Sequence, residues 1–197
     1  MDQPITFVGR GGLKLHHALT SFEVTPAGLT CADFGCNVGG FTDCLLQLGA
    51  SKVYAVDTGY GALAWKLRQD PRVVVMERTN AMHAPAHEPV DMIAIDLGWT
   101  PQRHAIPAAI KWLKAQGRII SLIKPHYEVP KEDANSLLKD GVLDDVDAER
   151  ITQATVAGLP TLGVEVLGLT KSPITGGVTK KNKRGNAEWL VLLKPIG

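Results

Sequence analysis

CADFGCNVGGFT, residues 31–42, is the most informative segment of this sequence. It follows a short apolar run and leads into a helical pattern at 41–49, after which a second apolar run, 53–56, ends on Asp57. Glycines between a strand and a helix let a ligand approach the backbone, and an acid at the end of the next strand accepts hydrogen bonds from ribose hydroxyls. The segment therefore predicts a nucleotide-binding β-α-β unit.

The spacing within this turn indicates which nucleotide is expected. The motif reads, in order, Asp33-x-Gly35-x-x-x-Gly39-Gly40. It differs from the dinucleotide pattern Gly-x-Gly-x-x-Gly, and an acid precedes the turn. This variant suits a ligand with a ribose and an amino-acid tail but no pyrophosphate, which is S-adenosylmethionine. A glycine-rich turn without a ligand is the alternative, because short motifs often match by chance; the spacing to Asp57 favours the cofactor.

Composition is that of an ordinary soluble domain, with 45% hydrophobic and 21% charged residues among 197. We expect one domain over residues 1–197, with 1–28 as its N-terminal segment. The sequence lacks an apolar run of about 18 residues and a secretion signal, which predicts a cytoplasmic protein without a membrane segment. Three cysteines, at 31, 36 and 44, are interpreted as reduced thiols near the glycine turn rather than as metal ligands.

Charge is distributed unevenly although the net charge is only +1. A basic cluster near the C-terminus consists of Lys180, Lys181, Lys183 and Arg184. Arg10 lies in another stretch without acids, whereas acids gather in residues 132–149. A local basic patch can neutralise several phosphates without raising the net charge, so we expect Arg10 and the basic cluster to bind RNA. A solvated loop is the alternative for the basic cluster.

Apolar runs alternate with helical patterns along the chain. The expected strands are residues 29–32, 53–56, 73–76, 91–95, 118–123, 164–169 and 189–193, and the expected helices are 41–49, 62–68, 104–116 and 145–158. Nearly continuous apolar strands separated by helices predict a Rossmann-like α/β fold, a mostly parallel sheet with helices on both faces. Ligands bind at the carboxyl ends of such strands. Four polar residues lie just past expected strand ends: Asp57, Asn80, Asp96 and Lys124.

Three further motifs point to a family. They are RGGLKL at 10–15, ERTN at 77–80 and SPITG at 172–176. With the glycine turn and Ile123-Lys124-Pro125, they resemble the TlyA-like (haemolysin A) branch of the FtsJ-like RNA 2′-O-methyltransferases. The resemblance extends from about Val8 to Lys194. It implies an S-adenosylmethionine-dependent enzyme that methylates a ribose hydroxyl of RNA, with ribosomal RNA or a ribosomal subunit as the expected partner.

The resemblance also implies a catalytic tetrad. It falls here on Lys14, Asp96, Lys124 and Glu188. A lysine base must lose its proton, and we expect Lys124 to be that base, with Lys14 assisting it. The two acids would orient the lysines, and no metal is needed because the sulfonium charge disappears during transfer. Taken singly, each residue has another interpretation: a solvated lysine, a strand cap, a helix cap or an exposed strand residue.

The expected cofactor contacts are Asp33, Gly35, Gly39, Gly40, Phe41, Asp57, Asn80 and Asp96. Asn80 is also typical of a simple turn. The tryptophans, at 65, 99, 112 and 189, are expected mostly in the core. Trp99 directly follows the strand that ends at Asp96, however, so it could instead stack on a base.

The sequence departs from the family in three places. Members usually carry an N-terminal S4 RNA-binding domain, but only about nine residues precede the RGGLKL motif, so that domain is either absent or lies outside this sequence. Asp96-Leu97-Gly98-Trp99 replaces the common Asp-Val-Ser-Phe, and the loop after the SPITG motif carries the basic cluster. Two other functions stay open: methylation of an acceptor other than RNA, and a non-catalytic RNA-binding or haemolysin-like role.

Overall fold

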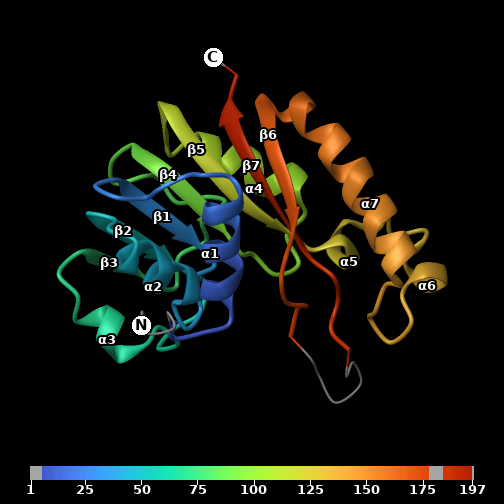
Figure 1. The fold of residues 1–197 in the computed structure, drawn as a ribbon, viewed down its shortest axis with the longest axis horizontal. Coiled ribbons are helices and arrows are strands. Elements are labelled where there is room, and N and C mark those ends of the chain that lie inside the picture. Colours follow the sequence, from blue (N-terminus) through green and yellow to red (C-terminus); the bar gives the residue numbers. More distant parts are fainter. Residues whose placement is uncertain (1–5, 178–183, 197) are drawn as a thin grey trace.

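A computed structural model describes residues 6–177 and 184–196. One seven-stranded sheet forms its centre, in the order β3-β2-β1-β4-β5-β7-β6 (Figure 1). The strands are β1 (Thr30–Phe34), β2 (Lys52–Val56), β3 (Val73–Met76), β4 (Val90–Ile95), β5 (Leu113–Ile123), β6 (Val164–Lys171) and β7 (Trp189–Pro195). The first five are parallel, and β7 runs antiparallel to both β5 and β6. The predicted Rossmann-like, mostly parallel sheet is confirmed.

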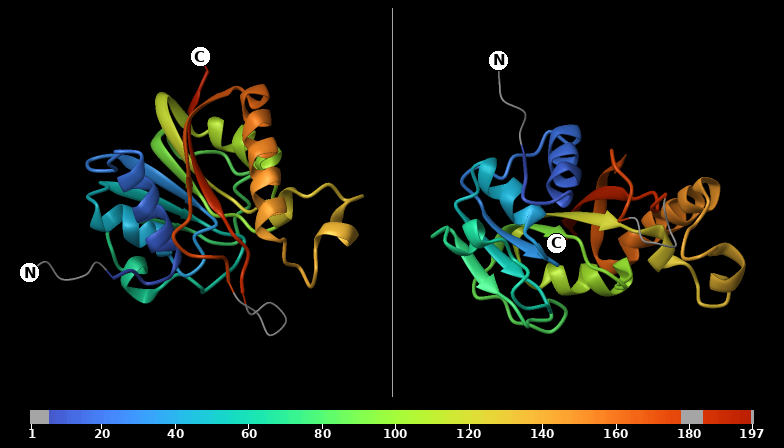
Figure 2. Two further views of the ribbon diagram at one scale, coloured as in Figure 1. Left: turned by 45° about the vertical axis from the view of Figure 1, so that its right-hand side comes forward. Right: turned by 90° about the horizontal axis from the view of Figure 1, so that it is seen from below.

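Helices cover both faces of this sheet. They are α1 (Gly11–Ser21), α2 (Gly40–Gln47), α3 (Trp65–Arg68), α4 (Gln102–Ile110), α5 (Pro125–Glu128), α6 (Ala134–Leu137), α7 (Asp145–Gly158) and a 3-10 turn, Leu159–Leu162. The blue α1 and the green α4 lie on opposite sides of the sheet in the right-hand view of Figure 2. No helix within the described ranges is long and apolar enough to cross a membrane.

Burial of both faces explains why the strands are apolar at successive positions. Successive side chains of a strand point to opposite faces. In β1, Cys31 packs in the cluster under α1 and α2, whereas Ala32 and Phe34 pack in the cluster under α4 and α7. Two cores therefore share the same sheet. The three cysteines are free and buried.

The helix expected over 104–116 is shorter than predicted. It ends at Ile110, and β5 already begins at Leu113. The side chain of Trp112 decides this boundary, because it is only 2% exposed and its Nε1 donates a hydrogen bond to the Ala84 carbonyl over 3.0 Å. Tertiary burial of one large ring thus overrides local helical preference.

Other boundaries shift without changing the architecture. The helix expected at 62–68 is confined to Trp65–Arg68, and β1 runs on to Phe34. Helices α5 and α6 and the 3-10 turn were not predicted. Two of the four tryptophans expected mostly in the core are exposed, Trp65 by 74% and Trp99 by 84%.

Candidate active site

A cavity of about 570 Å³ lies at the carboxyl ends of the parallel strands. Its size is within the usual range for a small-molecule site. It collects residues from the RGGLKL motif, the glycine turn and the ends of β2, β3, β4 and β5. The predicted site residues that line it are Lys14, Gly35, Gly40, Phe41, Asp57, Asn80, Asp96, Lys124 and Glu188.

The glycine turn adopts backbone conformations that only glycine takes without strain. Gly35 has a φ of 90°, and a Cβ there would approach the Asp96 carbonyl oxygen to 2.5 Å. Gly39 has a φ of 99°, and a Cβ there would meet Leu67 at 2.2 Å. Gly35 therefore lets two strand ends come together at the cavity, whereas Gly39 does not line the cavity and serves the packing of the turn.

Asp33 supports the turn from below. It is fully buried and does not line the cavity, and its Oδ2 accepts hydrogen bonds from the Thr42 amide at 2.9 Å and the Thr42 hydroxyl at 2.7 Å. Burial raises the pKa of Asp33 to about 7. Its second oxygen, Oδ1, has no hydrogen-bond partner among the described residues. These contacts join the end of β1 to the start of α2.

Asp57 and Asn80, two of the predicted cofactor contacts, both line the cavity. Asp57 accepts hydrogen bonds from the amides of Asn37 at 2.8 Å and Gly59 at 2.7 Å, which fix its carboxylate at the cavity wall. Asn80 uses its Oδ1 to accept from the Met82 amide at 3.0 Å. Asn80 thus makes the turn contact proposed as its simple alternative and also lines the cavity.

Two lysine–carboxylate ion pairs occupy the other part of the cavity. Lys14 on α1 contacts Glu188, which precedes β7, with 2.5 Å between Nζ and Oε2. Lys124 after β5 contacts Asp96 after β4, with 2.5 Å between Nζ and Oδ1. Burial raises the pKa of Glu188, and the positive charges of Lys14 and Lys124 oppose that rise. Segments far apart in the sequence therefore bring all four tetrad residues together.

Burial excludes two of the alternative interpretations. Lys14 is only 7% exposed, so it is not a solvated surface lysine, and Glu188 is only 3% exposed, so it is not an exposed strand residue. Asp96 does not cap the next helix either, because α4 begins after Pro101.

Sequence reasoning missed two aromatic residues that follow Lys124. His126 is partly buried, and its Nδ1 has no hydrogen-bond partner in the described part of the chain. Burial lowers the pKa of His126 to about 4, with the charges of Lys124 and Lys14 adding to the effect. Its ring lies 4.1 Å from that of Tyr127, centroid to centroid, and Tyr127 lines the cavity. Their only sequence signal is adjacency to Lys124.

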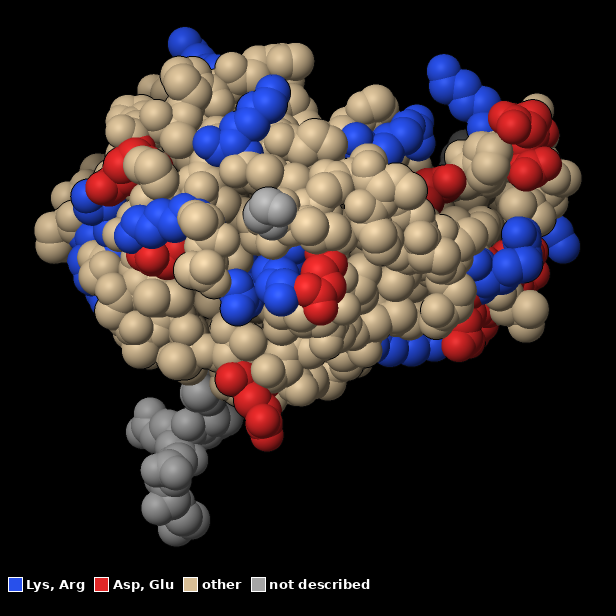
Figure 3. Space-filling view, turned by 90° about the horizontal axis from the view of Figure 1, so that it is seen from above, with Lys and Arg blue, Asp and Glu red and all other residues tan. Residues whose placement is uncertain are grey.

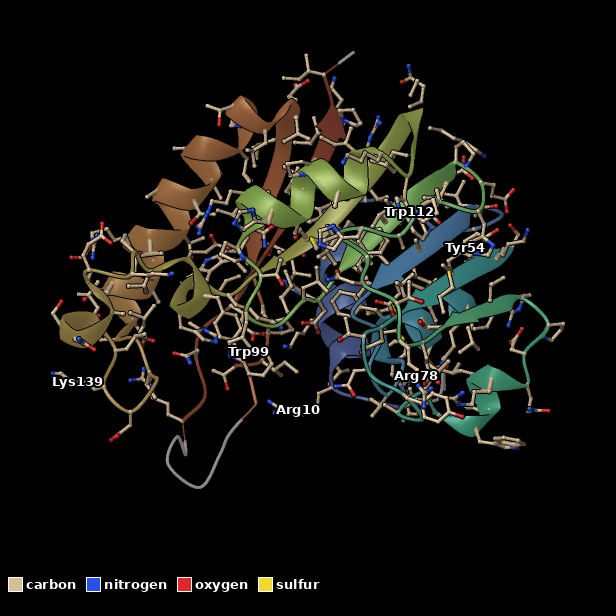
Figure 4. The ribbon with its side chains drawn as sticks, turned by 180° about the vertical axis from the view of Figure 1, so that it is seen from behind. Arg10, Tyr54, Arg78, Trp99, Trp112 and Lys139 are labelled. Carbon is tan, nitrogen blue, oxygen red and sulfur yellow. The ribbon has the colours of Figure 1, made fainter. Side chains whose placement is uncertain are left out.

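The predicted RNA-contacting residues are only partly described. Arg10 is exposed and donates to the Thr175 carbonyl over 3.0 Å, which joins the RGGLKL and SPITG motifs at the same edge as Trp99 (Figure 4). Arg184 forms an ion pair with Asp145 on α7. Lys180, Lys181 and Lys183 lie outside the described residues. On the side shown in Figure 3, described basic and acidic side chains are interspersed.

Comparison with known proteins identifies the family. The FtsJ-like methyltransferase family matches residues 7–193. The chain belongs to this family. It is 41% identical over 196 residues to "Putative rRNA methyltransferase YqxC" of Bacillus subtilis, covering 96% of this chain and 66% of that protein. It is 36% identical over 197 residues to "16S/23S rRNA (cytidine-2'-O)-methyltransferase TlyA" of Mycobacterium tuberculosis, covering 98% and 70%.

The fold is that of solved relatives as well. A "Putative hemolysin from Streptococcus thermophilus" superposes with a TM-score of 0.87 at 35% identity, over 99% of this chain and 69% of that one. The chain thus spans about two thirds of the length of these relatives. The TlyA-like, FtsJ-like resemblance is confirmed, and with it a methyltransferase that uses S-adenosylmethionine as methyl donor.

The residues present fit that cofactor. Gly35 and Gly40 of the glycine turn line the cavity, Asp57 offers there a carboxylate of the kind that accepts hydrogen bonds from ribose hydroxyls, and Asp96 lines the same cavity. Among the described residues, no group of three or more metal-ligating side chains is present.

Proposed function

We propose that this chain is an S-adenosylmethionine-dependent 2′-O-ribose methyltransferase of RNA, with cytoplasmic ribosomal RNA or a ribosomal subunit as its substrate. The observation that carries the proposal is the tetrad: Lys14, Asp96, Lys124 and Glu188 line the cavity that the glycine turn also lines. The names of the two ribosomal-RNA-methylating relatives support the substrate class.

The cofactor supplies a methyl group activated by a positively charged sulfur. Asp57 and Asn80 would hold the adenosine end, and Gly35, Gly40 and Phe41 would contact the rest of the molecule, since all five line the cavity. Asp96 would lie near the methionine end, and it orients Lys124 through their 2.5 Å contact. Fixing both reactants in one cavity supplies much of the rate enhancement, since the ribose oxygen must approach the methyl carbon in line.

Lys124 is the proposed general base. In its uncharged form, its Nζ would accept the proton of the 2′-hydroxyl as the ribose oxygen takes the methyl group and the carbon–sulfur bond of the cofactor breaks. The Leu97 carbonyl, 3.1 Å from Nζ, helps to hold the amine at the end of β5. Lys14, itself held by Glu188, binds the hydroxyl oxygen or the adjacent phosphate. His126 is uncharged at neutral pH, so it adds no further positive charge beside the base.

One experiment tests this function directly. Unmodified 16S and 23S ribosomal RNA, made by transcription in vitro, and isolated ribosomal subunits are incubated with the protein and labelled S-adenosylmethionine. We expect label in RNA, mapped to ribose 2′-oxygens. Calorimetry without RNA measures cofactor binding separately. If the protein binds the cofactor but labels no RNA, RNA is not the acceptor. The acceptor would then be a molecule other than RNA, and its methylation should not require Lys14 and Lys124.

A further inference from the structure

Trp99 is an exposed tryptophan at the edge of the cavity. It follows the end of β4, three residues after Asp96, and 84% of its surface is accessible. It lines the same cavity as Asp96 and Lys124. Large aromatic rings normally bury their apolar faces. A ring left this open beside a proposed catalytic base is positioned to receive a flat ligand.

The backbone at Trp99 is strained. Its φ is 52°, a left-handed conformation that bulky residues rarely adopt. The preceding residue is Gly98, which could take a positive φ without strain, yet the positive φ falls on the tryptophan. Strained residues of this kind gather at functional sites, where the surrounding structure holds them. The strain sets the direction of the indole ring.

Tyr127 backs the indole ring. It lies on α5, three residues after Lys124, and its ring centroid is 5.8 Å from that of Trp99, with 37° between the ring planes. Both rings line the cavity. Helix α5, which begins directly after Lys124, and the strained loop after β4 therefore each contribute one aromatic ring to the cavity that Lys124 and Asp96 also line.

A second groove begins on the other side of Trp99. It has a volume of about 430 Å³, and Met82, His104 and Lys111 are among the residues that line it with Trp99. Trp99 lines both hollows, together with Met82 and Thr100. A nucleotide bound at the tetrad could thus place its base against the indole while the chain continues towards Lys111.

We propose that Trp99 is the stacking platform for the base of the nucleotide whose ribose is methylated. This inference rests on the proposed RNA methyltransferase function and adds to it the residue that positions the acceptor. Proteins that bind unpaired nucleotides stack bases on aromatic side chains, and such stacking tolerates any base because every base has a π face. Holding the base fixes the ribose, and so orients its 2′-hydroxyl towards Lys124.

The test compares three variants on in vitro-transcribed 16S and 23S ribosomal RNA. Trp99→Ala should lower kcat/KM for RNA on the order of 10- to 100-fold. Trp99→Phe should restore most of that loss, because it retains an aromatic face. Trp65→Ala is the matched control, since Trp65 is 74% exposed on α3 but does not line the cavity. The dissociation constant for S-adenosylmethionine should be unchanged in all three.

A second measurement replaces the base rather than the protein. An RNA fragment that carries the mapped site is made with and without the base of the methylated nucleotide. Wild type should lose as much kcat/KM on the abasic RNA as Trp99→Ala loses on the intact RNA, and Trp99→Ala should lose nothing further on the abasic RNA. In a Trp65→Phe background, the intact fragment should quench the tryptophan fluorescence more than the abasic one.

Several results would overturn the inference. Equal kcat/KM for Trp99→Ala and Trp65→Ala would remove any role for the indole in RNA binding. Weaker cofactor binding by Trp99→Ala would assign the ring to the cofactor instead. If the losses in kcat/KM caused by the abasic RNA and by Trp99→Ala are independent of each other, the indole ring contacts another nucleotide. Absence of RNA methylation by the wild type would refute the proposed function itself, and it is seen before any variant is compared.

Discussion

Two lysine–carboxylate pairs face the same cavity at the same 2.5 Å separation, but they differ in access to solvent. In the Lys14–Glu188 pair, the side chains are 9% and 3% exposed, whereas Lys124 and Asp96 are 15% and 23% exposed. Removing one partner of a buried pair leaves an uncompensated charge, whereas a more open pair can exchange its partner for water or substrate. The difference supports the proposed roles, in which Lys14–Glu188 fixes the site and Lys124–Asp96 reacts in it.

The largest effect is expected from the proposed base. Lys124→Arg keeps the positive charge but cannot accept a proton, because the guanidinium stays charged. Methyl transfer should fall roughly 10²–10⁴-fold, measured as single-turnover label incorporation into RNA. Lys14→Arg, the matched change in the other pair, should reduce the rate less. If Lys124→Arg retains most of its activity while Lys14→Arg does not, the assignments of the two lysines are exchanged.

Stability should show the opposite ranking of the two pairs. Lys14→Met leaves Glu188 buried without its cation and should lower the free energy of unfolding by roughly 3–5 kcal/mol. Lys124→Met leaves a more accessible carboxylate and should lower it by about 1 kcal/mol. Urea unfolding without ligand measures both. The double change Lys14→Met with Glu188→Leu should recover much of the lost stability. If Lys14→Met and Lys124→Met destabilise the protein equally, the two ion pairs do not differ in the way described.

Asp33 extends the comparison to a buried acid without a lysine partner. Its pKa in the folded protein, about 7, exceeds the ordinary 3.8, so the folded state binds this proton more tightly than the unfolded state. The contribution of Asp33 to the free energy of unfolding is therefore at its maximum below about pH 4. It decreases by up to ~4 kcal/mol as the pH rises to about 7. Asp33→Asn should remove this pH dependence of the free energy of unfolding, measured by unfolding curves recorded between pH 4 and 8. An unchanged slope would show that Asp33 is charged throughout.

The cofactor half of the cavity should respond in binding rather than in chemistry. Asp57→Ala should weaken S-adenosylmethionine binding by about 1.5–3 kcal/mol, the scale of hydrogen bonds to a charged group. Calorimetry measures this, with Asp70→Ala as a control, because Asp70 is an acid that pairs with Arg72 outside the cavity. Unchanged affinity in folded Asp57→Ala would defeat the assignment.

The smallest effect concerns the strained loop. Trp99→Gly should raise the free energy of unfolding by about 0.5–1 kcal/mol, because relief of the left-handed strain exceeds the entropy lost by glycine. Glu23, after α1, has a similar φ of 55°, so Glu23→Gly is a matched control. Only Trp99→Gly should also impair RNA methylation. A destabilised Trp99→Gly would indicate that indole packing, rather than strain, dominates at this position.

The strands of the sheet were predicted more accurately than the helix boundaries and the burial of side chains around them. Strands buried on both faces leave apolar runs that are visible without any tertiary information, whereas the four tetrad positions were predicted only from the resemblance to the family. The end of α4 could not be predicted, because it depends on Trp112 finding the Ala84 carbonyl across the fold. Burial of Lys14 could not be predicted either, because only the folded chain brings Glu188 to it across 174 positions.

Exposed and buried tryptophans are also indistinguishable in the sequence. Trp99 and Trp112 both lie near apolar segments, yet one is 84% and the other 2% exposed. The difference arises from the backbone at residue 99, which turns its ring outward. Likewise, no local pattern shows that the rings of His126 and Tyr127 contact each other at a tilt of 50° beside the proposed base.

The position of β7 has a consequence for synthesis of the protein on the ribosome. It follows β5 and β6 along the chain, yet it lies between them in the sheet, and the residue directly before it is Glu188. Until Glu188 and β7 leave the ribosome, β5 keeps an unpaired edge, β6 lacks its partner β7, and Lys14 lacks its carboxylate. A nascent chain therefore cannot bring the four tetrad residues together before the segment 188–195 has been synthesised and has paired between β5 and β6.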